Sequence, residues 1–551
     1  MQTKFIFVSG GVISGLGKGI VVSSLALLLK SAGFRVSPIK ADPYLNIDAG
    51  TMNPTIHGET FVTEDGLETD QDLGHYERFI DEDLTKLNYM TSGQIYLSVI
   101  ERERRLEYEG ACVEIIPHIP QEIIRRLKLL ASKSRADFVI IEIGGTVGEY
   151  QNSMFLEAAR ELALKVPADV LNIHVAYLPL PPSLGELKSK PVQTSVQLMN
   201  MAGVRPDIIV GRAVKEVDRT RKEKISTFCS IAFEDIFSSP DMPTIYQVPE
   251  HLESQGFTDR VLDKLHLKRR ASNLSKWHIF NQKILSTRNK VKIGIVGKYF
   301  RSGDFSLEDS YICVIEAVKQ ACWWNSVTPE IIWVDSVDVE KKGTEAVLTG
   351  FDGLIVPQGW GNRGIEGKIQ TASFARKNKI PYLGLCFGMQ LAAIDFARNV
   401  CKLTGANTEE ADPKTKHPII HIMPHQKEYL LKRQYGGTMR LGAWPCVLKK
   451  GTLIYESYNK WTKLGVNSLY HLPEVHERHR HRYEFNKKYK KIFEDHGMVF
   501  SGMSPDDMLV EAVELANHPF FVGTQFHPEF KARPLNPHPL FLEFISACIN
   551  K

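Results

Sequence analysis

A glycine-rich loop near the N-terminus constrains the fold most strongly. Residues 4–8 have the pattern of a buried strand, with four apolar residues after Lys4, residues 10–19 are rich in glycine, and an apolar helical pattern follows. A strand, a glycine loop and a helix in this order cradle phosphate, because loop N–H groups and the helix N-terminus point at the anion. The spacing departs from G-x-x-x-x-G-K-[ST], since Val12 stands where the first glycine belongs and Gly19 replaces the hydroxyl residue. The loop therefore predicts an α/β phosphate site whose metal ligands come from elsewhere.

Short β-branched runs alternate with helical patterns along the chain, which is typical of parallel α/β folds. At 551 residues the chain is too long for one core. A polar, basic stretch at 265–290 separates two such series, so we expect a first domain at 1–268, a linker at 269–290 and a second domain at 291–551. The expected strands are 5–8, 36–42, 137–143, 170–177, 207–210, 244–248, 291–299, 330–335, 351–361, 380–388 and 520–530, with helices at 93–109 and 121–133.

Composition excludes several classes of protein. The net charge is +4, from 68 basic and 64 acidic side chains, so we expect no nucleic-acid partner. The eight cysteines include no C-x-x-C pair, which argues against a disulfide framework or a zinc site and for a reducing compartment. No run of about 18 uninterrupted apolar residues occurs, so no membrane span is expected. These features predict a cytoplasmic protein.

Three acids lie near the predicted carboxyl ends of strands in the first half, where ligands gather in open α/β sheets. They are Asp42, Asp72 and Glu142. Mg²⁺ takes oxygen ligands, often one or two carboxylates together with substrate phosphates. Asp72 and Glu142 could therefore replace the missing hydroxyl ligand, while Lys18 would neutralise the transferring phosphoryl group.

The second half contains a candidate nucleophile. Cys386 lies between Gly384 and Gly388, after an apolar strand and before a helix, which is the cysteine version of the G-x-S-x-G nucleophile elbow. The helix N-terminus favours the thiolate. His527 and Glu529 follow another strand and supply a base and a group to orient it. Backbone N–H groups at Phe387 and in the 357–361 loop could form an oxyanion hole.

The stretch "ERHRHRYE" (477–484) alternates, so as a strand it would place Arg478, Arg480 and Arg482 on one face and two histidines on the other. A histidine-pair metal site and a solvated strand face are alternatives. We favour arginines that meet carboxylates.

Several longer motifs then carry a family resemblance. They are "FIFVSGGVISGLGKGI", "IKADPYLNIDAGTM", "HGETFVTEDGLETDQDLGHYERF", "EIGGTVG", "SKPVQTSV", "GGTMRLG", "ERHRHRYE" and "FHPEF". Together they closely resemble CTP synthases over nearly the whole chain. The resemblance implies an N-terminal P-loop-type parallel α/β amidoligase domain and a C-terminal class I glutamine amidotransferase domain of flavodoxin-like α/β fold. It also implies the reaction: ATP phosphorylates O4 of UTP, and ammonia from glutamine, or free ammonia, displaces the phosphate to give CTP.

The resemblance further implies site residues, carried over motif by motif. The ATP set is Gly15, Leu16, Gly17, Lys18, Gly19, Ile20, Asp72 and Asp241, with Mg²⁺ on Asp72 and Glu142. The UTP and CTP set is Ser14, Glu149, Tyr150, Gln151, Lys188, Ser189, Lys190, Pro191, Val192, Gln193 and Lys224. The glutaminase triad is Cys386, His527 and Glu529, and the glutamine set is Gly359, Phe387, Gly388, Met389, Gln390, Glu410 and Arg482. His57 lies in the segment that the family uses near the ammonia passage. Tetramers, filaments, GTP activation and CTP inhibition are the implied regulation.

Three stretches depart from the family pattern. The usual "PGGFG" is "PQGWG" (357–361), which alters the glutamine-site wall and the neighbourhood of the GTP effect. The usual "GTVGDIES" is "GTVGEYQNS", and Pro240 stands at an often basic position of the adenine segment. Because Gln151 replaces an acid, we expect weaker CTP feedback.

Three alternatives stay open at this point. A P-loop amidoligase acting on a carboxylate, such as the cobyrinic acid diamide-synthesising type, is disfavoured by the "SKPVQ" segment with Lys224. A partition-type ATPase switch would not need Cys386, His527 and Glu529. A filament scaffold with decayed catalysis would not keep every catalytic position.

Overall fold

The computed structural model describes residues 2–299, 301–302, 305–306, 308–466 and 470–550. Its contacts divide the chain into two compact units. The first comprises Met1–Ile47 and His75–Asn281, and the second comprises Asp48–Gly74 and Gln282–Lys551. Among the described residues, no helix is both long enough and apolar enough to span a bilayer.

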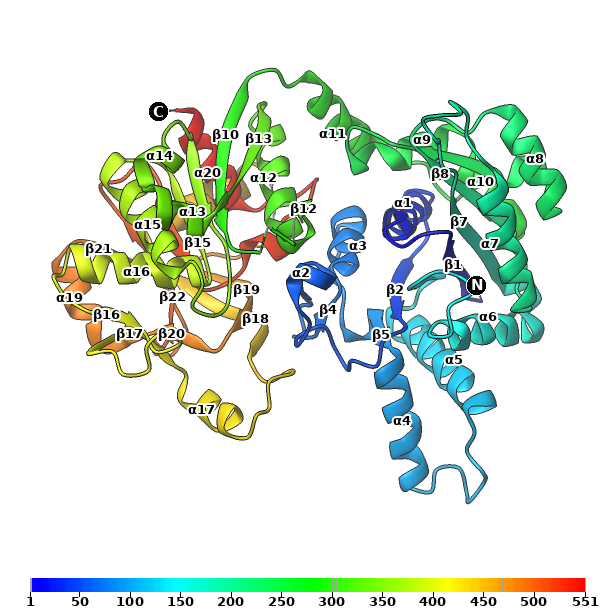
Figure 1. The fold of residues 1–551 in the computed structure, drawn as a ribbon, viewed down its shortest axis with the longest axis horizontal. Coiled ribbons are helices and arrows are strands. Elements are labelled where there is room, and N and C mark those ends of the chain that lie inside the picture. The colour runs from blue at the N-terminus through cyan, green and yellow to red at the C-terminus, as the bar shows by residue number, and fades with distance from the viewer. Residues whose placement is uncertain (1, 300, 303–304, 307, 467–469, 551) are drawn as a thin grey trace. The chain divides into compact units, whose positions relative to one another are not determined.

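The first unit is built on a seven-stranded sheet in the order β5-β2-β6-β1-β7-β8-β9, in which every neighbouring pair is parallel (Figure 1). The strands are β1 Lys4–Gly11, β2 Val36–Asp42, β5 Tyr89–Thr91, β6 Phe138–Ile143, β7 Val170–Tyr177, β8 Ile208–Ala213 and β9 Ile236–Pro240. Nearly every residue of β1, β6 and β7 is buried, because helices cover both faces of the sheet. Because β1 is the central strand, the glycine loop that follows it lies at the carboxyl edge of the sheet.

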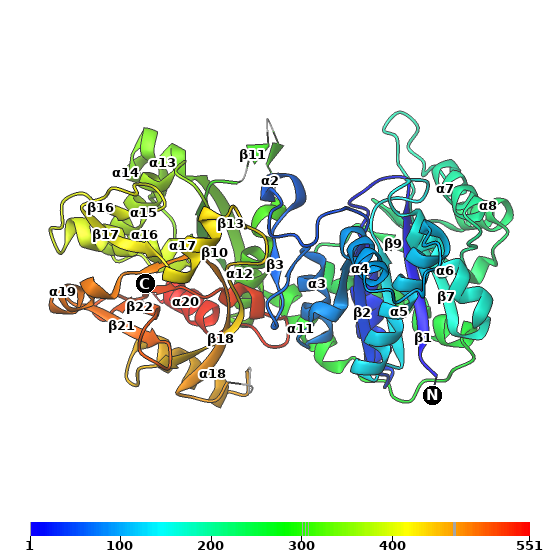
Figure 2. The ribbon, with the colours of Figure 1, turned by 90° about the horizontal axis from the view of Figure 1, so that it is seen from below.

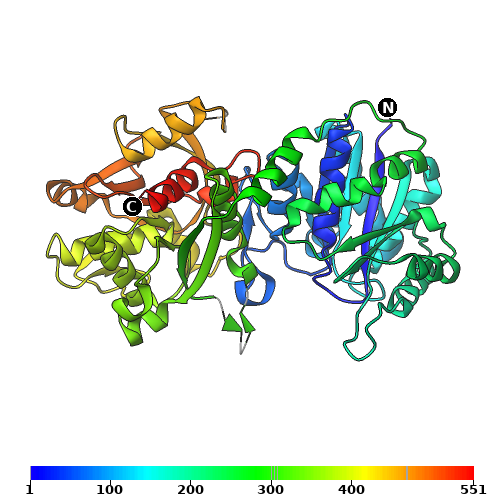
Figure 3. The same ribbon diagram turned by 90° about the horizontal axis from the view of Figure 1, so that it is seen from above.

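Helices of this unit bury apolar faces against the sheet. Figure 3 shows α1, in dark blue, running beside the strands. The helices are α1 Lys18–Ser31, α3 Asp72–Ile80 (from His75 onward), α4 Ser92–Arg104, α5 Ile115–Ser134, α6 Ser153–Lys165, α7 Lys190–Met201, α8 Arg219–Cys229, α9 Val248–Ser254, α10 Phe257–Lys264 and α11 Ser275–Ser286 (to Asn281). One core cluster joins Phe7 and Ile141 of the sheet to Leu127 of α5.

The second unit is built on a nine-stranded mixed sheet in the order β13-β10-β14-β15-β23-β22-β21-β18-β19. The strands are β10 Lys290–Gly297, β13 Thr328–Asp335, β14 Gly353–Val356, β15 Tyr382–Leu385, β18 Arg440–Leu448, β19 Glu474–His481, β21 Met498–Met503, β22 Val510–Leu515 and β23 Phe521–Thr524. The five strands from β13 to β23 are parallel, and the remaining pairs are antiparallel. A smaller sheet combines β16 Ala406–Thr408, β17 His417–Ile422 and β20 Tyr483–Phe485.

The helices of the second unit enclose its main sheet, and Figure 2 shows α12 and α20 in the same part of the unit. They are α2 Pro54–His57, α12 Ile312–Trp324, α13 Ser336–Lys342, α14 Thr344–Leu348, α15 Ile365–Asn378, α16 Phe387–Asn399, α17 Pro424–Leu431, α18 Leu453–Lys463, α19 Lys490–Asp495 and α20 Pro539–Ile549. Val314 of α12 and Phe541 of α20 join Ile293 of β10 in one core.

The segment Asp48–Gly74, which the sequence places in the first domain, packs with the second unit. It carries α2 and the small hairpin β3 Phe61–Val62 and β4 Glu68–Thr69. The Glu64 carboxylate lies 2.9 Å from Arg478 Nε, and Glu68 lies 2.8 Å from Arg480 Nε. The Ala443 N–H donates to the Glu64 carbonyl at 3.0 Å. Long-range ion pairs of this kind leave no periodicity in the sequence. The sequence therefore gave no sign that residues 48–74 pack with the second unit.

Most expected strands are confirmed, but the strand predicted at 244–248 is wrong. Thr244 accepts a hydrogen bond from the Tyr246 N–H, which closes a 3₁₀ turn that leads into α9. Tyr246 is buried beside Trp277, with ring centroids 5.8 Å apart. Tertiary aromatic packing therefore overrides the β propensity of the stretch. The edge strand of the sheet is β9 instead, and the short strand β5 was not predicted.

Candidate active sites

The thiol of Cys386 lies on a sharp turn between β15 and α16. Its backbone has φ of 51°, a left-handed conformation that a non-glycine residue adopts only under tertiary constraint. A Cβ on Gly388 would lie 1.9 Å from the Val356 carbonyl oxygen, and one on Gly384 would lie 2.8 Å from the Gly388 carbonyl carbon. Only glycine fits at these two positions, which confirms the elbow geometry and places the thiol at the N-terminus of α16.

His527 and Glu529 form a buried pair in the same unit. The Nδ1 of His527 lies 2.6 Å from Glu529 Oε1, and the Nε2 has no hydrogen-bond partner among the described residues. Burial alone would lower the pKa of His527, but the charges of Glu529 and Cys386 outweigh burial and raise that pKa to about 10. The histidine is therefore held with Nε2 available and with its positive charge stabilised, as a base serving a thiol requires.

The residues predicted to bind the substrate glutamine divide into two groups. Gly359, Phe387, Gly388, Met389 and Gln390 lie around the elbow, all buried. The Gln390 amide donates to the Tyr483 carbonyl at 2.9 Å and to Gln525 Oε1 at 3.1 Å, so it supports the elbow from behind.

Glu410 and Arg482 reach the site from other elements. Glu410 accepts the Gly361 N–H at 2.8 Å, and burial raises the pKa of its carboxyl. Arg482 donates to Gln426 Oε1 at 2.7 Å. Both therefore fix loops around the site in this structure.

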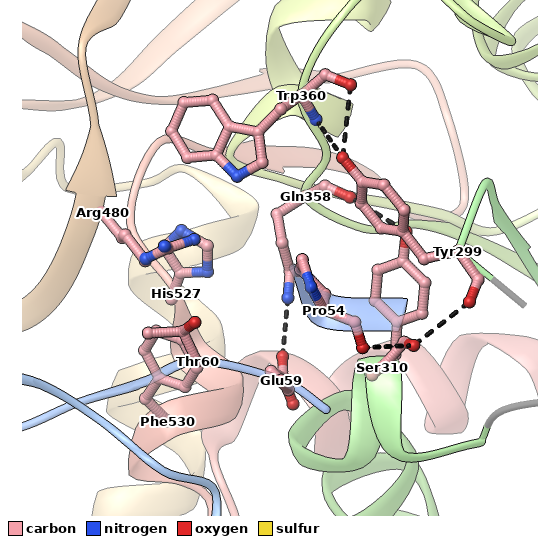
Figure 4. A pocket seen from close by; sticks show the side chains of 11 residues that line it. Pro54, Glu59, Thr60, Tyr299, Ser310, Gln358, Trp360, Arg480, His527 and Phe530 are labelled. Carbon is pink, nitrogen blue, oxygen red and sulfur yellow. Dashed lines mark hydrogen bonds between the residues drawn. The ribbon is translucent and has the colours of Figure 1, made fainter. Parts of the chain in front are cut away.

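A small pocket opens beside His527 (Figure 4). Its lining residues are Pro54, Glu59, Thr60, Tyr299, Ser310, Tyr311, Gln358, Trp360, Arg480, His527 and Phe530. The close-up shows Gln358 pointing at Glu59, and Nε2 of Gln358 lies 2.6 Å from Glu59 Oε1. Sequence reasoning missed Glu59, Thr60, Tyr299 and Tyr311. The only signal concerned Glu59 and Thr60, which follow His57 with Gly58 between.

A second, more open pocket shares Pro54, Trp360 and Arg480 with the first. It is lined by Gly50, Thr51, Met52, Pro54, Trp360, Tyr435, Met439, Arg480 and Arg482. The Arg480 guanidinium lies 5.5 Å from the ring centroid of Trp360, and that of Arg482 lies 5.9 Å from the ring of Tyr435. Two cations on aromatic faces give this opening a surface suited to flat, anionic molecules.

The predicted strand 477–484 is confirmed as β19, with Tyr483 continuing in β20. Arg478 and Arg480 form ion pairs with Glu64 and Glu68 of the same chain, whereas Arg482 donates to Gln426 and to the Tyr435 carbonyl. His479 and His481 lie 3.1 Å apart between Nδ1 and Nε2, on the side of Arg440 and Glu511. No group of three metal-ligating side chains occurs within the described chain.

In the first unit, the glycine loop joins β1 to α1. Gly17 precedes the helix with φ of 90°, Gly15 has φ of 67°, and Val12 has φ of 85° despite its branched side chain. The Lys18 side chain packs against Gly10: a Cβ at position 10 would lie only 2.6 Å from Lys18 Cδ. Its Nζ donates to the Gly145 carbonyl at 2.8 Å. Ser14 and Gly15 are exposed, whereas Leu16 and Gly19 are buried. The exposed face of the loop thus offers backbone to a ligand.

The carboxylates at the edge of this sheet surround a lysine. Glu142, at the end of β6, lies 2.8 Å from Lys40 Nζ and accepts a hydrogen bond from the Tyr76 hydroxyl. Asp42 lies 3.9 Å from the same Lys40 nitrogen. Asp72, at the start of α3, belongs to the second unit, and its N–H donates to Asp70 Oδ1 at 2.9 Å. Glu142 and Asp42 offer carboxylate oxygens, the type of ligand that Mg²⁺ takes.

A cluster of cations lies near the N-terminus of α7. Lys188 and Arg221 each form an ion pair with Glu186, and the charge of Lys224 also lowers the pKa of Glu186. Ser189 precedes α7 and Lys190 and Pro191 begin it, while Val192 and Gln193 are buried in its first turn. The predicted lysines are therefore gathered in one place. Glu186 and Arg221 were not predicted.

The remaining predicted nucleotide residues lie on loops of the first unit. Glu149 accepts a hydrogen bond from Thr146, whereas Tyr150 is 95% exposed and Gln151 is exposed. Asp241 lies 2.7 Å from Arg212 Nη2, and a Cβ on Gly17 would lie 3.8 Å from Arg212 Nε. Arg212 thus connects Asp241 with the phosphate loop, a role that no sequence motif indicated.

Comparison with known proteins gives consistent matches. Residues 4–267 match the family model for the CTP synthase N-terminus, and residues 306–547 match that for glutamine amidotransferase class-I. The chain is similar to a CTP synthase of Caldanaerobacter subterraneus, with 49% identity over 550 residues that cover 100% of this chain and 99% of the relative. It is 47% identical to a CTP synthase of Halalkalibacterium halodurans, with 100% of both chains covered. Among solved structures, the glutaminase domain of Trypanosoma brucei CTPS with bound acivicin covers 47% of this chain and 94% of its own, with 35% identity and a TM-score of 0.42.

Proposed function

Because this chain belongs to the CTP synthase family, we propose that Cys386, His527 and Glu529 are the catalytic triad that releases ammonia from glutamine. The chain is a glutamine-hydrolysing ligase that aminates UTP to CTP, with ATP as co-substrate, in pyrimidine biosynthesis. One observation carries the assignment of residues: His527 Nδ1 is bound to Glu529 while Nε2 is left without a partner in the described chain.

The glutaminase step follows from this arrangement. The Cys386 thiolate attacks the side-chain amide carbon of glutamine, forming an S–C bond and a tetrahedral oxyanion. His527 gives its proton to the leaving nitrogen, so that the C–N bond breaks and ammonia departs. Water then hydrolyses the thioester to glutamate with His527 as base. Gly359, Phe387, Gly388, Met389, Gln390, Glu410 and Arg482 form the glutamine site in this proposal.

The synthetase step is proposed for the first unit. Gly15, Leu16, Gly17, Lys18, Gly19 and Ile20 hold the ATP phosphates, with Asp241 near the adenine. Lys18 stabilises charge on the transferring phosphoryl group, which passes to O4 of UTP. Ammonia then attacks C4, and phosphate leaves as CTP forms. The exposed loop backbone at Ser14 and Gly15 supports this assignment.

Asp72 and Glu142 are the proposed magnesium residues. The pairing of Glu142 with Val8, two residues before Gly10 of the glycine loop, supports the assignment of Glu142. Bound Mg²⁺ would supply neutralisation of phosphate charge.

The pyrimidine nucleotides UTP and CTP are assigned to two sets of residues. Lys188, Ser189, Lys190, Pro191, Val192, Gln193 and Lys224 take the triphosphate, supported by the cation cluster around Glu186. Ser14, Glu149, Tyr150 and Gln151 take the remainder of the nucleotide, and Gln151 weakens inhibition by CTP. The open pocket at Trp360 and Arg480 is the place where we expect GTP to act as an activator.

Ammonia leaves the glutaminase site through the small pocket beside His527 in this proposal. Pro54, Glu59 and Thr60 bring the segment around His57 to that pocket. A homotetramer, filament assembly and cytoplasmic location complete the proposal, and they rest on the family resemblance.

The test is CTP formation from UTP with ATP and Mg²⁺, supplied in parallel with glutamine or ammonium. Product from both sources supports the ligase and its glutaminase together. Product from ammonium alone would implicate the altered loop at Gln358 and Trp360 or a missing activator. No product from either source, with ATP bound to a folded chain, would contradict the proposed site.

A further inference from the structure

Two buried lysines lie beneath the loop 357–361. Lys298 follows β10 and is 3% exposed, and Lys368 lies in the first turn of α15 and is 0% exposed. Lys298 Nζ donates to the Gly361 carbonyl at 2.6 Å. Lys368 Nζ donates to the Pro357 carbonyl at 2.9 Å and to the Gln358 carbonyl at 3.3 Å. The role proposed for the catalytic triad does not use either lysine.

The bonds of Lys368 set the direction of one peptide group. The Gln358 carbonyl accepts from Lys368 and also from the Tyr311 hydroxyl, at 3.3 Å in each case. The bond between Gln358 and Gly359 is trans, so the Gly359 N–H points opposite to that carbonyl and away from Lys368. When the Gln358 carbonyl is held in place, the direction of the Gly359 N–H is therefore fixed as well.

The Gly359 N–H is a buried donor that has no partner among the described residues. The next two backbone N–H groups do have partners. The Trp360 N–H donates to the Tyr299 hydroxyl and the Gly361 N–H donates to Glu410, each at 2.8 Å. A buried N–H without a partner is costly and calls for a functional explanation. A developing oxyanion would be such a partner.

Packing keeps this peptide in place. A Cβ on Gly359 would lie 2.9 Å from Lys298 Cε and 3.3 Å from Lys368 Nζ, so the lysines support the loop directly. The loop follows β14, whose Val356 pairs with Gly384 of β15, two residues before Cys386. The sheet thus carries the Gly359 peptide and the thiol on adjacent strands.

We propose that Lys368 is a positioning residue of the glutaminase: it holds the Gln358 carbonyl so that the Gly359 N–H faces the oxygen that becomes negative when Cys386 attacks the amide. Lys368 itself does not touch the substrate. Burial, together with the charge of Lys298, lowers the pKa of Lys368 well below its ordinary value. Charged or neutral, the amine has at least two hydrogens, enough for the two carbonyls that it contacts.

The test compares Lys368→Met with Lys377→Met in the full chain. Lys377 lies on the same helix but is exposed, so its variant controls for loss of a lysine from α15. We expect Lys368→Met to lower kcat for glutamine hydrolysis by about 10²-fold with KM changed less than about threefold, the pattern of an interaction made only in the transition state.

A second readout separates positioning from a general structural effect. Iodoacetamide alkylates Cys386 by attack of sulfur on a saturated carbon with loss of iodide, and no oxyanion develops. We expect the alkylation rate at Cys386, followed by peptide mass spectrometry, to be unchanged in Lys368→Met. A fall in alkylation parallel to the fall in turnover would overturn the proposal, as would a kcat within twofold of the unsubstituted chain.

If Lys368→Met fails to fold, Tyr311→Phe tests the same positioning of the Gln358 carbonyl. It removes the other donor to the same carbonyl and preserves the packing of the ring. We expect a several-fold lower kcat with unchanged alkylation. Full glutaminase activity in Tyr311→Phe, combined with an unfolded Lys368→Met, would assign the lysine to folding and overturn the positioning role.

Discussion

Gln358 donates its Nε2 hydrogen to Glu59 Oε1 across 2.6 Å, joining the loop after β14 to the segment 48–74. Glu59 also accepts the Cys313 N–H at 2.7 Å and is 4% exposed. Burial is the main cause that raises the pKa of Glu59 to about 7, the charge of Glu529 adds to it, and the hydrogen bonds from Cys313 and Gln358 oppose it. Glu59 and the proposed glutaminase base, His527, therefore line the same pocket.

This relationship predicts a pH-dependent stability. The pKa of Glu59 in the folded chain lies above its ordinary value of 4.5, because the folded chain favours the protonated carboxyl. The contribution of this carboxyl to the free energy of unfolding is therefore complete below pH 4.5 and is lost as the pH rises through about 7. Glu59→Gln removes this dependence. Between pH 5 and 8 the unsubstituted chain should lose up to about 3 kcal/mol of unfolding free energy relative to the variant. Denaturant unfolding at both pH values measures the difference, and equal losses in the two chains would contradict the assignment.

Cys386→Ala should abolish CTP formation from glutamine and leave formation from added ammonium near the unsubstituted rate. The substitution removes the nucleophile while the nucleotide residues of the first unit are unchanged. Cys112→Ala is the matched control, because Cys112 is exposed and lies outside both proposed sites. Loss of both activities in Cys386→Ala would contradict the division of the reaction between two sites.

Lys18→Met should lower CTP formation from both nitrogen sources by at least about 10³-fold, because Lys18 is the side chain proposed to stabilise charge on the transferring phosphoryl group. Lys30→Met, at the far end of the same helix, serves as the control. Parallel assays with glutamine and with ammonium make the measurement. Retention of ammonium-dependent synthesis in Lys18→Met would remove the loop from the proposed ATP site.

Gln151→Glu should strengthen inhibition by CTP several-fold. A carboxylate accepts hydrogen bonds from nucleotide hydroxyls more strongly than an amide does. CTP inhibition curves at fixed UTP give the comparison. An unchanged inhibition constant would show that the lost acid does not set feedback in this chain.

Local patterns in the sequence were sufficient for much of the fold. The runs that became β2 and β7 were predicted to the residue, because β-branched residues recur in each, although β2 also contains Lys40 and Asp42. The elbow at Cys386 was predictable because the bend tolerates only glycine at 384 and 388. The pairing of His527 with Glu529 was predictable because their spacing of two residues makes it local.

The sequence by itself thus determined the two α/β series, the glycine-rich loop, the elbow at Cys386 and the pairing of His527 with Glu529, since each depends on neighbours along the chain. Only the tertiary structure decided that Glu59, Glu64 and Glu68 pack with the second unit, that the stretch 244–248 turns instead of extending, and that Lys368 lies beneath Gly359. These features arise from contacts between distant residues, whose burial and charge pairing leave no periodic trace in the chain.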